Sequence, residues 1–156
     1  MRRASAFLCV VLGACSALGE RQEAVIGGDV DDGDPAVVSL AVGDSSLCTG
    51  TLVSHWSVLT AGHCLLDGDV VFGTDVTAPV KRIAVAASAR HPLYSAEGAP
   101  YDLALVTLKE PASATPVRLD LDPFGDGDVG TPMRHVGFGV TSDATGMGRG
   151  TKRTVS

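Results

Sequence analysis

Two short segments carry residue types that could activate a nucleophile. Residues 59–64 read LTAGHC, so that His63 follows an apolar run and is joined directly to a cysteine. Residues 101–105 read YDLAL, which places Asp102 at the start of a second apolar run. An imidazole can accept a proton near neutral pH, and a carboxylate drawn into an apolar setting needs a partner such as an imidazole N–H. The two segments therefore predict a general base, His63, that is oriented by Asp102.

The composition suits one compact domain, or one domain plus a processed leader, and argues against nucleic-acid binding. Of the 156 residues 45% are hydrophobic and 19% are charged, and the formal net charge is -6. Phosphate binding needs clustered Lys and Arg, so nucleic acid is excluded as a partner. The basic pair Lys152 and Arg153 is expected on a solvated strand or loop edge. His55, His91 and His135 lack informative flanks and are expected to be ordinary surface or loop residues.

The chain begins with the pattern of an export signal over residues 1–19. Two arginines precede an apolar run over residues 4–12, which is too short to span a bilayer permanently. Residues 12–15 (LGAC) resemble a bacterial lipobox, in which Cys15 would be lipidated and would tether a bacterial lipoprotein to the cell envelope. Residues 17–19 (ALG) also fit a cleavage site, and cutting there would release a soluble secreted product. The lipoprotein is our first expectation and the secreted form the alternative.

The rest of the chain reads as an all-β domain. Runs of apolar or β-branched residues, separated by Gly, Asp and Pro, predict strands over residues 36–42, 47–53, 57–61, 70–72, 80–87, 103–108 and 133–140. This spacing favours an antiparallel barrel or sandwich over an alternating α/β fold. Residues 20–24 read as a linker or propeptide, and residues 151–156 as the beginning of a further strand.

Further segments around the two chemical ones resemble the trypsin-like serine proteases, the chymotrypsin-fold family. In chain order they are residues 25–28 (VIGG), 48–53 (CTGTLV), 56–59 (WSVL), 91–94 (HPLY) and 136–141 (VGFGVT). The family usually has a Trp at the position of Phe138 and an Asn at that of Tyr101. The resemblance implies a truncated peptidase domain over residues 25–156, with the N-terminal Greek-key barrel of a two-barrel fold and a second barrel missing after its first strand.

The same resemblance implies a serine endopeptidase that acts on protein or peptide substrates and needs no cofactor or metal. His63 would be its general base and Asp102 the group that orients the base. The family's nucleophile lies in a GDSGG-type segment of the second barrel, and the nearest similar segment here, residues 125–128 (GDGD), has no serine. The chain alone is therefore expected to be inactive. The alternative is a non-catalytic exported binding or scaffold module derived from a protease.

The resemblance also implies a disulfide and an activation site. Cys48 and Cys64 remain once the leader is removed, and the family joins two such cysteines beside its catalytic histidine. Val25 would be the N-terminus freed by activation, with its amine buried against an Asp that precedes the nucleophile. Ala24 is not the Lys or Arg after which a trypsin-type activator cuts, so activation by such an enzyme is in doubt.

Two acidic clusters raise the question of calcium. They cover residues 29–34 (DVDDGD) and 120–128 (DLDPFGDGD). The twelfth position of an EF-hand loop requires a carboxylate, but counting from each cluster places Leu40 and Thr131 there. Solvated aspartates in turns are therefore expected at both clusters, and no metal site is predicted.

Overall fold

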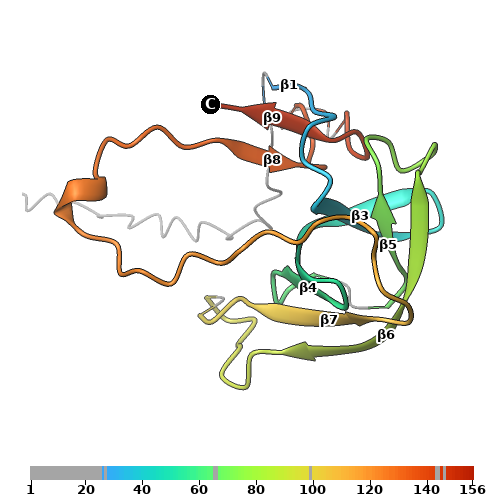
Figure 1. The fold of residues 1–156 in the computed structure, drawn as a ribbon, viewed down its shortest axis with the longest axis horizontal. Coiled ribbons are helices and arrows are strands. Elements are labelled where there is room, and N and C mark those ends of the chain that lie inside the picture. The colour runs from blue at the N-terminus through green and yellow to red at the C-terminus, as the bar shows by residue number, and fades with distance from the viewer. Residues whose placement is uncertain (1–25, 27, 65–66, 99, 143–144, 146) are drawn as a thin grey trace, which may run out of the picture.

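The strands form a closed antiparallel barrel with a small sheet beside it (Figure 1). This computed structural model describes residues 26, 28–64, 67–98, 100–142, 145 and 147–156. The strands are β1 (Asp29–Val30), β2 (Val37–Val42), β3 (Ser45–Ser54), β4 (Ser57–Thr60), β5 (Asp69–Phe72), β6 (Lys81–Arg90), β7 (Ala104–Leu108), β8 (His135–Gly137) and β9 (Arg153–Val155). The barrel runs in the order β2-β3-β4-β7-β6-β5, and β1, β9 and β8 form the second sheet. The all-β prediction is confirmed.

Some of the predicted features lie outside the described residues. These are the export signal over residues 1–19, Cys15, the linker over residues 20–24, and Val25. Within the part of the chain that is described, no helix is long and apolar enough to cross a membrane.

Strand alternation fills the barrel with aliphatic side chains. In β7 the side chains of Ala104, Val106 and Leu108 are buried, whereas Leu105 and Thr107 between them are exposed. This period of two is what a strand with one covered face requires. The core cluster consists of Ala36, Val38, Leu40, Leu52, Val58, Val70, Phe72, Ile83, Val106, Leu108 and Ala112. The predicted runs therefore supply the barrel interior.

Phe138 anchors a second, smaller core cluster. Its side chain is fully buried and packs with Ala41, Val71 and Val76, which lie outside the main cluster. Its backbone N–H donates to Thr49 Oγ1 at 2.9 Å. Phe138 thus fastens the chain that follows β8 to the barrel wall.

Long-range pairing produced two differences from the predicted strands. β1 lies in a segment that was expected to be a turn, and it forms because Asp29 and Val30 pair with β9. β6 continues to Arg90, three residues beyond its predicted end at 87, since Arg90 pairs with Ala104 of β7. Neither partner is near in sequence, so local residue patterns gave no signal for them.

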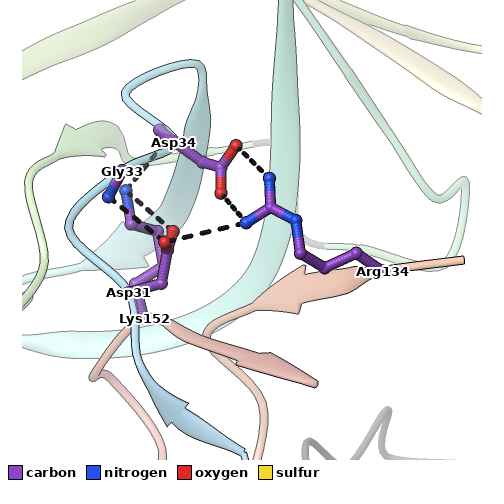
Figure 2. A network of polar contacts seen from close by, with 5 residues as sticks. All are labelled: Asp31, Gly33, Asp34, Arg134 and Lys152. Atoms are coloured by element: carbon purple, nitrogen blue, oxygen red, sulfur yellow. Dashed lines mark hydrogen bonds and ion pairs between the residues drawn. The ribbon is translucent and has the colours of Figure 1, made fainter. Parts of the chain in front are cut away.

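The expectation of solvated charges at Lys152 and Asp31 was wrong (Figure 2). Lys152 is only 2% exposed, and its Nζ donates to the Asp34 carbonyl at 2.7 Å and lies 3.7 Å from Asp31 Oδ2. The pairing of β1 with β9 explains this burial. It continues to the next residues, where the Asp31 amide donates to the Lys152 carbonyl at 2.9 Å, so both side chains are desolvated at the same place.

Arg134 extends this network to the segment before β8. Its guanidinium donates to both carboxylate oxygens of Asp34, at 2.6 and 2.8 Å (Figure 2). These hydrogen bonds, with the charge of Arg134, hold the pKa of Asp34 below its usual value of 3.8 despite the opposing effect of burial. The acidic segment that looked like a solvated turn therefore ties the start of the barrel, just before β2, to the second sheet.

Candidate active site

The barrel brings His63 and Asp102 together from positions 39 residues apart. β4 ends at Thr60, and β7 begins at Ala104. These two residues are partners in the antiparallel pairing of β4 with β7. Because antiparallel neighbours run in opposite directions, the residues just after β4 meet those just before β7. His63 and Asp102 occupy these adjoining loops.

Two hydrogen bonds join the candidate base to the carboxylate. Asp102 Oδ2 lies 2.7 Å from His63 Nδ1, and Asp102 Oδ1 accepts the backbone N–H of His63 at 2.8 Å. An ionised carboxylate only accepts hydrogen bonds, so Nδ1 carries the proton and Nε2 is the basic nitrogen of the neutral ring. The His63 side chain is 50% exposed and that of Asp102 is 26% exposed. The arrangement therefore presents a fixed imidazole in the tautomer that a general base needs.

The surroundings of Asp102 keep its carboxylate ionised. Partial burial raises the pKa of Asp102. The hydrogen bonds from the His63 ring and amide, the attraction of the protonated His63 ring and the Gly62 amide lower it, and their combined effect is larger than that of burial. The pKa therefore lies below its usual value of 3.8. The carboxylate thus holds its charge at neutral pH and can stabilise an imidazolium.

Gly62 allows the carboxylate to approach closely. A Cβ built at this position would lie 2.9 Å from a ring carbon of Tyr94 and 3.2 Å from Asp102 Oδ1. The Gly62 carbonyl accepts a hydrogen bond from Arg90 Nε, and the Arg90 guanidinium lies 5.5 Å from the Tyr94 ring centroid. The glycine is therefore packed between the carboxylate and an aromatic side chain, which the sequence motif alone did not explain.

The predicted disulfide is present beside the histidine. Cys48 of β3 is bonded to Cys64, with an S–S distance of 2.03 Å and a sequence separation of 16. The bond anchors the turn that carries His63 to the barrel. Ligand atoms of Cys48, His63 and Cys64 lie within 4.8 Å of one another, but both sulfurs are used in the disulfide and neither can act as a thiolate ligand.

The surroundings of the pair include one histidine that the sequence analysis had not assigned to the site. Among the described residues no hydroxyl group hydrogen-bonds to the His63 ring. His91, expected to be an ordinary residue, stacks on Tyr101 beside Asp102, whereas His55 bonds to the Ala112 carbonyl away from the site. The one available signal for the stack was the unusual Tyr at position 101.

Comparison with known proteins identifies the family of the chain. The family model described as Trypsin matches residues 25–155. The chain belongs to the trypsin family. Among curated relatives of this trypsin-family chain, Glucanase inhibitor protein 1 of Phytophthora infestans is 33% identical over 137 residues, covering 81% of this chain and 53% of that protein. Trypsin 5G1 of Aedes aegypti is 35% identical over 121 residues, covering 70% of this chain and 44% of that protein.

The trypsin-family chain spans about half the length of the curated relatives it matches. Both come from eukaryotes, an oomycete and an insect, so they give no support to the bacterial source predicted from the lipobox. Mouse neuropsin, a serine protease, has a TM-score of 0.70 over 84% of this chain and 63% of its own, at 22% identity. That likeness establishes the fold.

Proposed function

We propose that the domain over residues 25–156 supplies the base and its orienting carboxylate to a trypsin-like serine endopeptidase. His63 takes the proton of a serine hydroxyl, and Asp102 holds the ring in the required tautomer and stabilises the imidazolium. The observation that carries the proposal is the 2.7 Å contact between His63 Nδ1 and Asp102 Oδ2. Protein or peptide would be the substrate, with no cofactor, metal or nucleic acid involved.

The nucleophile of this proposed enzyme would come from a second barrel. The 156-residue sequence contains no GDSGG-type segment, and the oxyanion hole of the family lies beside that segment. Removing one member of a Ser-His-Asp triad leaves about 10³- to 10⁴-fold catalysis, which comes from the oxyanion hole and substrate binding. The 156-residue chain by itself lacks those groups as well, so we expect it to be inactive until a second barrel completes it.

The second candidate is a non-catalytic exported binding module. Its support is the similarity to Glucanase inhibitor protein 1, whose name describes an inhibitor rather than a hydrolase. Such a module would bind a protein through the trypsin-like scaffold. The intact contact of His63 with Asp102 favours the enzyme, since a binding scaffold has no chemical need of that pair.

A fluorophosphonate probe, which labels activated serines, separates the two functions. We expect no labelling of the 156-residue chain, and labelling when it is co-expressed with a trypsin-like second barrel that carries the GDSGG segment. His63→Ala should abolish that labelling, and Asp102→Asn should reduce its rate about 10⁴-fold, the loss known for this change in the triad. Labelling of the chain alone would refute the missing nucleophile, and an assembled but unlabelled complex would favour the binding module.

Export is the remaining part of the proposal. Residues 1–19 would be the signal and residues 20–24 a linker or propeptide, with Cys15 lipidated or removed. Cleavage before Val25 would free the amine used in activation and would also release the domain from any lipid. Metabolic labelling with palmitate tests the tether: label that Cys15→Ser removes supports the lipoprotein, and unlabelled protein in the medium supports soluble secretion.

A further inference from the structure

Tyr101 has an unusual backbone conformation immediately before the candidate carboxylate. Its φ is 56°, and it is the one residue other than glycine with a positive φ in the described part of the chain. L-residues avoid this left-handed region because Cβ crowds the following carbonyl, and a bulky side chain there is an outlier. Such strain persists only where surrounding contacts hold it.

A ring stack with His91 supports Tyr101. The two ring centroids are 4.9 Å apart, and the planes differ by 8°. Tyr101 is 55% exposed, so its ring lies at the surface, and the stack with His91 covers one face of it. The Leu93 amide donates to His91 Nδ1 at 3.2 Å, which fixes the orientation of the imidazole. The stabilisation of an aromatic pair is of the same order as the cost of a left-handed residue.

The left-handed residue shapes the turn that presents Asp102. The Leu103 amide donates to the Tyr101 carbonyl at 2.7 Å, which closes a three-residue turn centred on Asp102. The Leu103 carbonyl in turn accepts the His91 amide at 2.8 Å. His91 therefore holds both sides of the turn, one through its ring and the other through its backbone.

We propose that Tyr101 and His91 are positioning residues for the pair formed by His63 and Asp102. The stack stabilises the left-handed backbone, and that backbone aims the two carboxylate oxygens at the ring and the amide of His63. Asn or Gly would adopt the same conformation at lower cost. A tyrosine there needs the external support that His91 gives. The catalytic importance of this arrangement rests on the proposed function, but the positioning itself does not.

NMR of the 156-residue chain tests the positioning without any need for activity. The first readout is the low-field signal of the His63 Nδ1 proton, which requires a short hydrogen bond to the carboxylate. The second is the pKa of Asp102 followed by carbon-13 NMR of its carboxyl group. We expect His91→Ala to weaken the first signal and to move the Asp102 pKa upward, because hydrogen bonds from His63 are among the contacts that hold it down.

A rescue variant distinguishes positioning from a general loss of structure. If the stack serves to hold a left-handed backbone, Tyr101→Gly makes it dispensable, so the double variant with His91→Ala should recover both readouts. His55→Ala is the matched control, because the His55 ring hydrogen-bonds the Ala112 carbonyl away from the site, and the variant should leave both readouts unchanged. The proposal is overturned if His91→Ala leaves both readouts at their native values. It is also overturned if adding Tyr101→Gly to His91→Ala fails to restore them.

These outcomes are separate from the fate of the proposed function. A chain with native NMR readouts that gives no fluorophosphonate labelling in the assembled complex would count against the enzyme and leave the positioning intact. A labelled complex whose His91→Ala form keeps the low-field signal would count against the positioning alone.

Discussion

Replacing Lys152 by Met should destabilise the fold more than any exposed ion-pair substitution. The ammonium group lies 3.7 Å from Asp31 Oδ2, and the two side chains are 2% and 7% exposed. Asp31 Oδ2 has no hydrogen-bond partner, so the buried oxygen relies on the charge of Lys152. The same ammonium also satisfies the Asp34 carbonyl. The substitution would leave the Asp34 carbonyl without this donor. It would leave the buried Asp31 carboxylate with the Gly33 amide at 3.1 Å and the half-exposed Arg134 Nη1 at 3.9 Å, without its buried counter-charge.

The expected magnitude follows from the burial. At an effective dielectric constant of about 20, unit charges at this separation interact by about 4 kcal/mol. Removing one partner of a buried pair costs about 3–5 kcal/mol, because the remaining charge stays desolvated. For a domain of this size each kcal/mol lowers Tm by about 2–4 °C, so a fall of roughly 6–20 °C is expected. Adding Asp31→Asn should recover most of the loss, since the buried charge is then gone.

Lys81→Met is the matched control for this experiment. Lys81 Nζ lies 2.7 Å from Glu110 Oε1, a shorter contact than that of Lys152, but both side chains are 53% exposed. Exposed pairs contribute at most about 1 kcal/mol. Urea unfolding of Lys152→Met, of its double variant with Asp31→Asn and of Lys81→Met measures each loss of stability. The loss is the shift in the urea midpoint, provided that the slope of free energy against urea is unchanged. The reasoning fails if Lys81→Met costs as much as Lys152→Met, because distance rather than burial would then decide.

Other perturbations probe the site and its supports. Reducing the Cys48–Cys64 disulfide should cost about 3 kcal/mol, as expected for a loop of this length, and urea unfolding with and without reductant measures the loss. Gly62→Ala should displace the carboxylate of Asp102 and remove the low-field proton signal, since the new Cβ has no room; an unchanged spectrum would contradict the packing described. Because the folded-state pKa of Asp34 lies below 3.8, its contribution to stability is complete above that pH and is lost as pH falls through the folded value. Arg134→Gln should therefore flatten the acid limb of the stability curve, measured by urea titrations between pH 2 and 6, whereas an unchanged limb would mean that the Arg134 pair is not its source.

Local patterns predicted the barrel strands well, because apolar and β-branched runs bounded by Gly, Asp and Pro supply the side chains that a barrel interior buries. Six runs of that kind became β2 to β7, with ends that differ by a few residues. The pair of His63 with Asp102 was predicted from residue types and from resemblance to a family, and the disulfide was implied by the resemblance; both contacts are present. β1 was missed, since a strand of two residues exists only through its partner β9.

The sequence alone determined which residues can do chemistry and which can fill a barrel, because residue type and local period are written along the chain. It also determined a likeness to the trypsin family through the order of its motifs. Only the tertiary structure decided that Lys152 and Asp31 are buried as a pair and that His91 stacks on Tyr101. These outcomes depend on strand register and on contacts between segments far apart in the sequence, such as Lys152 and Asp34, which are 118 residues apart. Desolvation and stacking arise only after such segments meet, so no local pattern encodes them.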